Sequence, residues 1–441
     1  MKRTSASTTI LITGLAGLLA CGGDPTKPSP PDTTSALQEI PITGTVVSGM
    51  TWYDKVIPDL MRKYKIPGGA VAVVRDGKLI YARGFGFADV ETKTPVQPDA
   101  LFRLASVSKP ITGVAIMKLV EDGKLRLDDR VAPLIADLAP VPGATIDPRW
   151  EQITIRHLLN HTAGFDRGVS IDPMFLPAVI ATATGTPAPA SAEAIIRYMK
   201  GRPLDFDPGA KFAYSNFGYD ILGRVIERVS GMPYDTFVRT RVLQPAGATR
   251  TRLGKTRLSD ALPDEVRYYW TGGVGVNWPI GPSVFAGEGA VPHNYGAFYI
   301  EAMDSHGGWV SSTVDLMRFL TAVDGRADRP DILTAGLVSE MTTKGAPACA
   351  GNACYYAAGW FVGPAQGVDA HWSHGGDLPG TTALLVRTSD RFSWIALFNA
   401  NPLFTAKPPA ADFKGELDAA LWNALAHVTS YPTHDLFTTF K

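Results

Sequence analysis

Near both ends of the chain, pairs of short apolar runs are separated by turn residues. Apolar runs occupy 71–75 and 79–84, on either side of Asp76-Gly77, and recur in 382–388 and 394–400. Short apolar runs that flank a turn are typical of β-hairpins, and Asp-Gly is one of the strongest two-residue hairpin signals. We therefore expect a hairpin near each end of the chain.

The hydrophobic pattern between these ends has a helical period. In 111–121, 219–229 and 313–323, apolar residues recur three or four positions apart, as on one face of a helix. Gly231 is placed to end the second helix, and Ser312 or Thr313 to cap the third. The middle of the chain is therefore predicted to be mostly helical.

Strands at the ends and helices between them predict an α+β fold. We expect an antiparallel sheet formed from both chain ends, flanked by helices, with an inserted, mostly helical region over roughly 110–345. The amphipathic pattern of 417–428 predicts a last helix that packs on this sheet.

The amino terminus has the features of an export signal. Met1-Lys2-Arg3 is cationic, and the apolar run that follows, up to residue 20, is too short to span a bilayer as a helix. Leu18-Leu19-Ala20-Cys21 resembles a bacterial lipobox, which predicts lipidation of Cys21; the alternative is an ordinary cleavable signal with an incidental cysteine. We expect an exported lipoprotein on the periplasmic or cell-surface side of a bacterial membrane.

This interpretation divides the chain into three segments. Residues 1–20 are the predicted signal peptide, and 21–45 form a flexible linker rich in Pro, Gly and Thr. Residues 46–441 form one catalytic domain, in which no period of 20 to 50 residues repeats.

Two cysteines remain besides Cys21. Cys349 and Cys354 lie in a turn-rich stretch that is able to close a small disulfide loop, which an oxidising compartment favours. The alternative is two reduced cysteines. No metal site is expected, because no further Cys or His lies near enough in sequence to complete a four-ligand set.

The charge balance excludes one large class of partners. Lys plus Arg equals Asp plus Glu at 42 each, so no basic face for nucleic acid or anionic lipid is implied. We expect a small-molecule substrate, no cofactor, and membrane contact only through the lipid anchor.

The first candidate catalytic motif is Ser106-Val107-Ser108-Lys109. Residues three apart share a helix face, so Lys109 is expected beside Ser106, at the start of the first predicted helix. A serine hydroxyl becomes a good nucleophile when a neighbouring base removes its proton, and a desolvated lysine is such a base. The alternative is a helix cap with a solvated lysine.

The second motif is Tyr214-Ser215-Asn216, at a loop-to-helix junction. A lysine ammonium nearby would lower the pKa of the Tyr214 phenol, which is then able to relay the serine proton and protonate the leaving group. Asn216 offers an amide donor and acceptor to orient the substrate and the lysine. The alternative for Tyr214 is an aromatic core residue.

The third motif is the strand-like stretch with His374, Gly375, Gly376 and Asp377. Its glycines let a substrate approach the strand edge, where the N–H groups of Gly376 and Asp377 are candidates for an oxyanion hole with that of Ser106. His374 is expected to face the pocket. The alternative is a glycine bend with a core histidine.

These three motifs together resemble the family of serine β-lactamases and penicillin-binding proteins, specifically its class C branch with the related family VIII carboxylesterases and D-aminopeptidases. The resemblance covers roughly residues 52–400. The supporting segments are IRHLLNHTAG at 155–164, similar to the family's HLLTHTSG signature, Pro208-Gly209, GGWVSS at 307–312 and GWF at 359–361.

The resemblance implies a β-lactamase/transpeptidase-like fold and assigns roles to the motif residues. Ser106 would be the acylated nucleophile, Lys109 and Tyr214 the bases, Asn216 the positioning residue, and His374 would replace the lysine of the "KTG" box. His157 and His161 carry over as structural residues.

Two departures from the family pattern bear on the substrate. His374 stands where class C β-lactamases have a lysine that binds the substrate carboxylate, which favours the esterase or peptidase relatives. Gly375 stands where Thr is usual, and Asp377 puts a negative charge near the predicted oxyanion hole. The chain contains no GxSxG motif, so an α/β-hydrolase nucleophile elbow is excluded.

The leading hypothesis is an exported serine hydrolase that works through an acyl-enzyme, a carboxylesterase or small-amide hydrolase. The alternatives are a D-amino-acid peptidase, a DD-carboxypeptidase or weak β-lactamase, and a slowly deacylating penicillin-binding sensor protein. Aromatic residues in the loop-rich stretch 254–305 are expected either to wall an acyl pocket or to pack within the insertion: Trp270, Trp278, Phe285, Tyr295, Phe298 and Tyr299.

Overall fold

The computed structural model describes residues 40–271, 279–345, 354–363, 370–404 and 413–440. The predicted signal peptide, Cys21 and Cys349 lie outside the described residues, so lipidation and the disulfide with Cys354 stay predictions. The sheet already includes β1 (Ile42–Thr43), ahead of the domain boundary predicted at residue 46.

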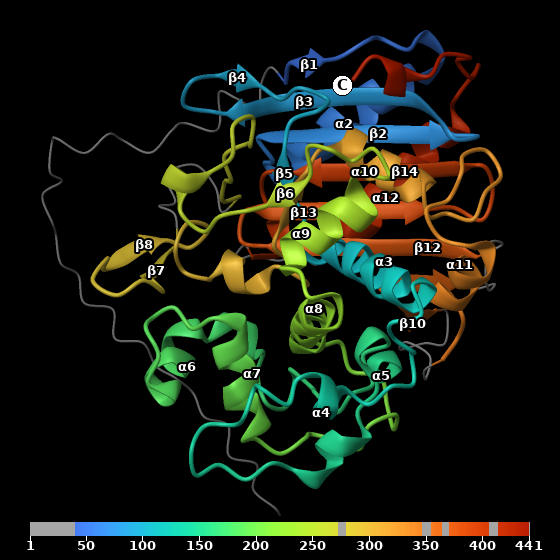
Figure 1. Ribbon diagram of the computed structural model, residues 1–441. Helices are drawn as coiled ribbons and strands as arrows, with labels where there is room; N and C mark the ends of the chain where they lie inside the picture. Colours follow the sequence, from blue (N-terminus) through green and yellow to red (C-terminus); the bar gives the residue numbers. More distant parts are fainter. Residues whose placement is uncertain (1–39, 272–278, 346–353, 364–369, 405–412, 441) are drawn as a thin grey trace, which may run out of the picture. The chain divides into compact units, whose positions relative to one another are not determined.

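One antiparallel sheet carries strands from both ends of the chain. Its order is β1-β3-β2-β14-β13-β12-β11-β10, with β4 paired to β3. The blue β2 and the red β14 lie side by side (Figure 1), with Val73 opposite Trp394. The strands of this sheet are β1, β2 (Gly68–Arg75), β3 (Lys78–Asp89), β4 (Thr94–Pro95), β10 (Tyr355–Ala357), β11 (Trp360–Gly363), β12 (His371–Leu378), β13 (Thr381–Arg387) and β14 (Phe392–Phe398).

Both predicted hairpins are confirmed. β2 and β3 are joined at Asp76 and Gly77, whose φ angles of 51° and 69° are those that a two-residue hairpin turn requires. β13 pairs with β14 in the same way. The predicted antiparallel sheet from both chain ends is therefore confirmed.

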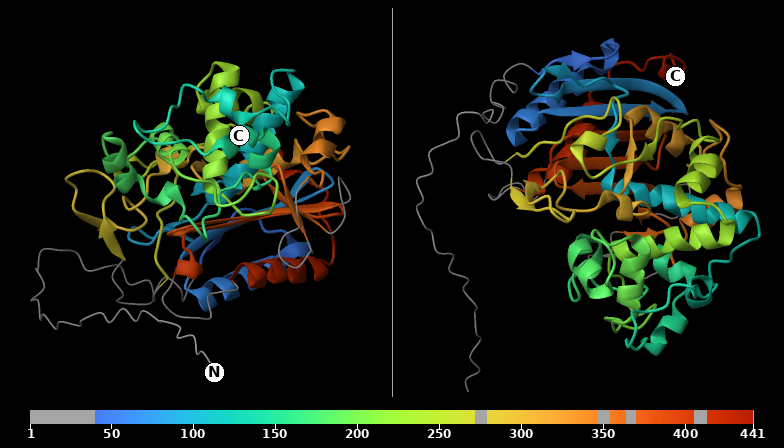
Figure 2. Two further views of the ribbon diagram at one scale, coloured as in Figure 1. Left: turned by 90° about the horizontal axis from the view of Figure 1, so that it is seen from below. Right: turned by 60° about the vertical axis from the view of Figure 1, so that its left-hand side comes forward.

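Helices cover both faces of the sheet. Seen from below, α2 (Thr51–Tyr64) and α12 (Phe413–Ala426) lie on one face, and the helical region lies on the other (Figure 2). β2 is buried on both sides because its side chains alternate between two apolar cores. Val71 and Val73 pack with α2 and α12, whereas Ala70 and Ala72 belong to the core that includes α3.

The inserted region is mostly helical, as predicted. Its helices are α3 (Ser108–Glu121), α4 (Val131–Leu134), α5 (Ile155–Leu159), α6 (Pro177–Thr184), α7 (Ala192–Lys200), α8 (Asn216–Ser230), α9 (Tyr234–Val238), α10 (Thr313–Thr321) and α11 (Ala335–Met341). It also holds a small sheet of β5 (Phe102–Arg103), β9 (Trp309–Ser311) and β6 (Arg252–Leu253), and a pair of β7 (Ile280–Pro282) and β8 (Ala290–Pro292).

The helix ends follow from their caps. The Ser215 side chain accepts the Gly218 N–H at the start of α8, and Gly231 ends this helix with φ 71°. Ser312 caps α10 by accepting the Asp315 N–H. These caps satisfy backbone groups that the helix itself leaves unpaired, and they fix where α8 and α10 begin.

Candidate active site

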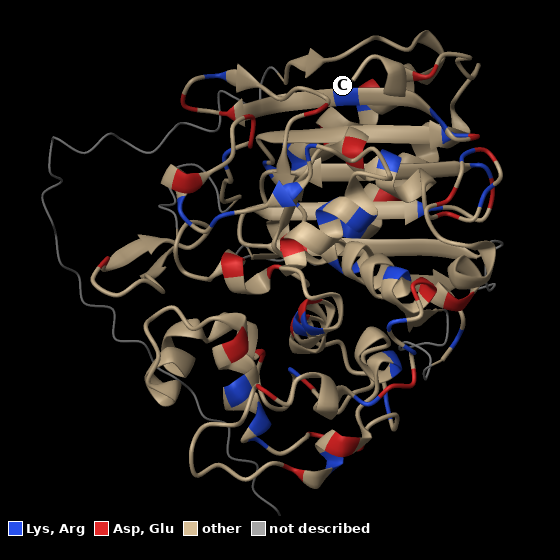
Figure 3. Ribbon diagram, viewed as in Figure 1, with Lys and Arg blue, Asp and Glu red and all other residues tan. Residues whose placement is uncertain are grey.

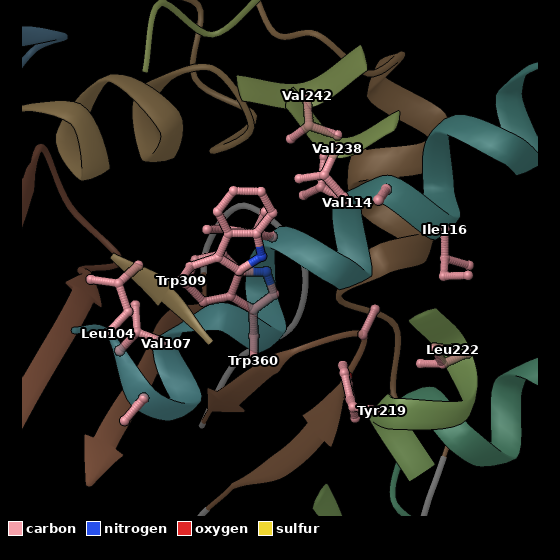
Figure 4. Packing of buried hydrophobic residues seen from close by; sticks show 14 of the residues in the cluster. Leu104, Val107, Val114, Ile116, Tyr219, Leu222, Val238, Val242, Trp309 and Trp360 are labelled. Atoms are coloured by element: carbon pink, nitrogen blue, oxygen red, sulfur yellow. The ribbon is translucent and has the colours of Figure 1, made fainter. Parts of the chain in front are cut away.

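Ser106 lies on a tight turn at the edge of the apolar core. The turn is a 3-10 helix at Ala105–Val107 that leads into α3, and Ala105 has φ 48°, a left-handed conformation that is strained for a residue with a side chain. Leu104, just before this turn, and Val107, its last residue, lie beside the buried Trp309 (Figure 4). The Trp309 carbonyl accepts the Leu104 N–H at 2.8 Å. The core thus holds the turn that presents Ser106.

Lys109 lies one turn further along and faces Ser106, as predicted. Its Nζ is 3.1 Å from Ser106 Oγ, 2.7 Å from Asn216 Oδ1 and 3.0 Å from the His306 carbonyl oxygen. The side chain is fully buried, and this burial holds the pKa of Lys109 well below its ordinary value. A neutral amine beside the serine is therefore available as a base.

Tyr214 lines the same cavity as Ser106, and its phenol is close enough to the serine side chain to interact with it. The Lys109 Nζ is 4.8 Å from the centre of the tyrosine ring. Burial raises the pKa of Tyr214 and outweighs the interaction with Ser106 and the charge of Arg167, which lower it. The expected lowering of this pKa by Lys109 is therefore wrong, and the phenol stays protonated at neutral pH.

Asn216 is the first residue of α8, and Asp172 orients its side-chain amide. Its Nδ2 donates to Asp172 Oδ2 at 2.6 Å, which leaves Oδ1 to accept from Lys109. The other Asp172 oxygen accepts the Met174 N–H at 3.2 Å. Asp172 therefore fixes which end of the Asn216 amide faces the lysine.

His374 lies on β12 with both ring nitrogens engaged by the protein. Nε2 is 2.9 Å from the Tyr356 hydroxyl and Nδ1 is 2.7 Å from the Gly375 carbonyl oxygen. Burial lowers the pKa of His374 to about 3, so the ring is neutral. The ring borders the cavity, and both of its hydrogen-bonding atoms have partners within the protein.

The glycines of the third motif allow a close approach between β12 and the Ser106 turn. A Cβ on Gly376 would lie 2.2 Å from the Leu104 carbonyl oxygen, so only glycine fits there. β11 pairs with β12 only as far as Ser373. From His374 onward, one edge of β12 has no strand partner among the described residues, which leaves backbone groups near Gly376 for a ligand.

Asp377 has a cationic partner that the sequence analysis missed. Its carboxylate forms an ion pair with Lys414 of α12 and accepts a hydrogen bond from Asn401 at 3.1 Å. This pair balances the negative charge that was expected to act on the oxyanion region.

One cavity of about 760 Å³ is lined by residues of all three motifs: Ser106, Tyr214, Asn216, His374, Gly375 and Asp377. Arg167, Asp172, His293 and Lys414 complete its polar side, whereas Lys109 is not among the lining residues. Its apolar wall consists of Phe175, Phe212, Ala297, Phe298, Phe361, Pro379 and Phe404. The loop aromatic residues were expected either to wall a pocket or to pack within the insertion, and both occur. Phe298 lines the cavity, whereas Phe285 packs against Tyr299 at 5.9 Å and Tyr295 against Tyr268 at 6.1 Å. Trp278 lies outside the described residues.

The predicted structural histidine His161 supports the site from behind. Its ring centre is 4.3 Å from that of Tyr214, and its Nδ1 accepts the Ser215 N–H at 3.2 Å.

Within the described ranges, no group of three or more His, Cys, Asp or Glu side chains is arranged to hold a metal ion. Among the same residues, no helix is both long enough and apolar enough to cross a membrane.

The fold and the Ser106–Lys109 geometry define a serine hydrolase. A family model described as Beta-lactamase matches residues 53–418, which is most of the chain. The chain therefore belongs to the beta-lactamase family, and the predicted fold and enzyme class are confirmed.

Three known proteins illustrate the likeness. Penicillin-binding protein 4* of Bacillus subtilis (strain 168) is 28% identical over 323 residues, 73% of this chain and 65% of that protein. Esterase EstB of Burkholderia gladioli is 33% identical over 195 residues, 44% of this chain and 49% of the esterase. The octameric penicillin-binding protein homologue from Pyrococcus abyssi has a TM-score of 0.62 at 25% identity, covering 84% of this chain and 76% of that one. The chain thus spans less than two thirds of the curated relatives' length.

Proposed function

We propose that the chain is an exported carboxylesterase or small-amide hydrolase that forms an acyl-enzyme on Ser106. One observation carries the proposal: a buried lysine nitrogen lies 3.1 Å from the serine hydroxyl and has fixed acceptors for its own N–H groups. A neutral amine held in this way is a base directed at Ser106.

The reaction follows from this arrangement. Lys109 takes the Ser106 proton while Oγ attacks the substrate carbonyl carbon, and the N–H groups of Ser106 and the β12 edge receive the oxyanion. Tyr214 relays the proton to the leaving group as the carbonyl re-forms. A water molecule then attacks the acyl-enzyme, and the acid is released as Ser106 regains its proton.

The cavity supports esters over carboxylate-bearing antibiotics. Its wall is largely aromatic and apolar, and the residue in the place of the family's lysine, His374, is neutral. An uncharged acyl or alcohol group loses little on leaving water for this wall, whereas a carboxylate placed against it, away from Arg167, loses much.

Turnover of p-nitrophenyl butyrate tests the proposal. Ser106→Ala should abolish it, while Ser339→Ala, which removes an exposed serine of α11, should leave it unchanged. Mass spectrometry of the quenched wild type should find the butyryl group on the peptide that contains Ser106. Full activity of Ser106→Ala would refute the nucleophile.

A substrate panel separates the remaining candidates. Faster cleavage of a D-Ala-D-Ala peptide or a D-amino acid amide than of the ester would identify a peptidase or amidase. A stable adduct with a chromogenic cephalosporin, with no ester turnover, would identify a penicillin-binding sensor.

The proposed location is the outer side of a bacterial membrane, held through lipidated Cys21. The full chain expressed in a bacterium should partition into detergent with the membrane fraction, and Cys21→Ala should move it to the soluble exported fraction. Equal partitioning of the two would refute the anchor.

A further inference from the structure

The Nζ of Lys109 is held by two fixed acceptors besides the serine. A neutral amine has two N–H donors and one lone pair. With Asn216 Oδ1 and the His306 carbonyl oxygen as acceptors for the two donors, the lone pair points at Ser106. The position of the His306 carbonyl therefore determines whether the lone pair of Lys109 is directed at Ser106.

A buried ion pair fixes the segment that carries this carbonyl. Arg224 of α8 donates to Asp304 Oδ2 at 2.5 Å, and both side chains are no more than 10% exposed. The other Asp304 oxygen accepts the N–H of Ser305 at 2.6 Å, one residue before His306. Blue and red positions lie close together on α8 (Figure 3), and the ion pair itself joins Arg224 to Asp304.

The same segment is also tied to α3. Thr112 donates to the Ser305 carbonyl oxygen at 2.6 Å, and the Trp309 N–H donates to Ser108 Oγ at 3.2 Å. The residues on both sides of His306 are therefore bonded to the helix that carries Lys109. Arg224 and Asp304 add the attachment to α8, the helix that begins with Asn216.

We propose that the Arg224–Asp304 pair is a positioning device for Lys109: it holds the His306 carbonyl so that the lysine lone pair is directed at Ser106. The pair touches neither the cavity nor the substrate. This inference rests on the proposed function and adds positioning residues to it.

The experiment measures kcat/KM for p-nitrophenyl butyrate as a function of pH in the wild type and in three variants: Asp304→Asn, Arg224→Met and Arg224→Lys. A displaced carbonyl misdirects the lone pair, so the first two should lose about tenfold to a hundredfold at the pH plateau. The loss of a carbonyl dipole that favours the ammonium should also move the acid limb to lower pH. Arg224→Lys keeps the charge and should recover most of the rate.

Asp315→Asn is the matched control. Asp315 is also buried, pairs with Arg318 at 2.9 Å and accepts the Arg250 N–H, but it lies on α10, outside the cavity lining. It should lower the melting temperature without moving the acid limb. The same pattern in Asp304→Asn and Arg224→Met would overturn the proposal. The Ser106→Ala result decides the proposed function separately, and Arg224→Met, compared with Arg224→Lys, keeps the test open if Asp304→Asn fails to fold.

Discussion

Lys414 and Asp377 form an ion pair at the rim of the cavity, between α12 and β12. Lys414→Met should leave the carboxylate unbalanced near the developing oxyanion and lower kcat/KM for p-nitrophenyl butyrate about tenfold, or about 1.4 kcal/mol. The double variant with Asp377→Asn should recover the rate because no unpaired charge remains.

The control for this pair lies on the same helix. Glu416 pairs with Lys63 on the surface at 2.5 Å, so Glu416→Gln should have little effect on rate. If Lys414→Met behaves like Glu416→Gln, the ion pair has no influence on the oxyanion.

Gly376 and Gly375 form a natural pair of test positions. Alanine at 376 would meet the Leu104 carbonyl oxygen at 2.2 Å and should push β12 from the Ser106 turn, with a loss of about a hundredfold in kcat. Alanine at 375 meets only the flexible side chain of Lys414, whose Nζ and Cδ would lie at 3.1 and 3.3 Å, and should lose far less. Equal kcat values for the two variants would contradict a role of this strand edge in the reaction.

The pH dependence of kcat/KM should report the protonation of Lys109. Because burial lowers the pKa of this lysine, the neutral form required of a base is present far below the ordinary lysine range. Asp172 raises this pKa and Arg167 lowers it. Asp172→Asn should therefore shift the acid limb to lower pH, and Arg167→Gln should shift it to higher pH. Shifts of the same sign would exclude Lys109 as the titrating group.

Acid should destabilise the fold through buried His374. Its pKa is about 3 in the folded protein and about 6.5 when unfolded, so the unfolded chain binds more protons between these values. Between pH 7 and pH 5, this residue alone should lower the free energy of unfolding by about 2 kcal/mol. Urea unfolding of His374→Gln should show a smaller drop than wild type, whereas exposed His427→Gln should match wild type.

Local signals explain why the elements were predictable. Asp76-Gly77 adopts the positive φ angles of a tight hairpin, and Gly231 adopts the one that ends α8. Ser106 and Lys109 meet because they are three residues apart on one helical path. In each case, residues adjacent in sequence carry the whole geometric requirement.

Long-range partners were not predictable in this way. Asp172 lies 44 positions from Asn216, and Lys414 lies 37 from Asp377, in segments without a motif. The direction of the Tyr214 pKa shift was also missed, because it depends on burial by several elements and not on the nearby lysine alone. Such contacts depend on how distant segments pack.

The pairing of β2 with β14 has a consequence for biogenesis. More than three hundred residues separate these neighbours, so the centre of the sheet closes only after nearly all of the chain is present. High contact order of this kind slows folding and leaves strand edges open to aggregation meanwhile. Truncation before β14 should therefore yield insoluble protein instead of a weakened enzyme.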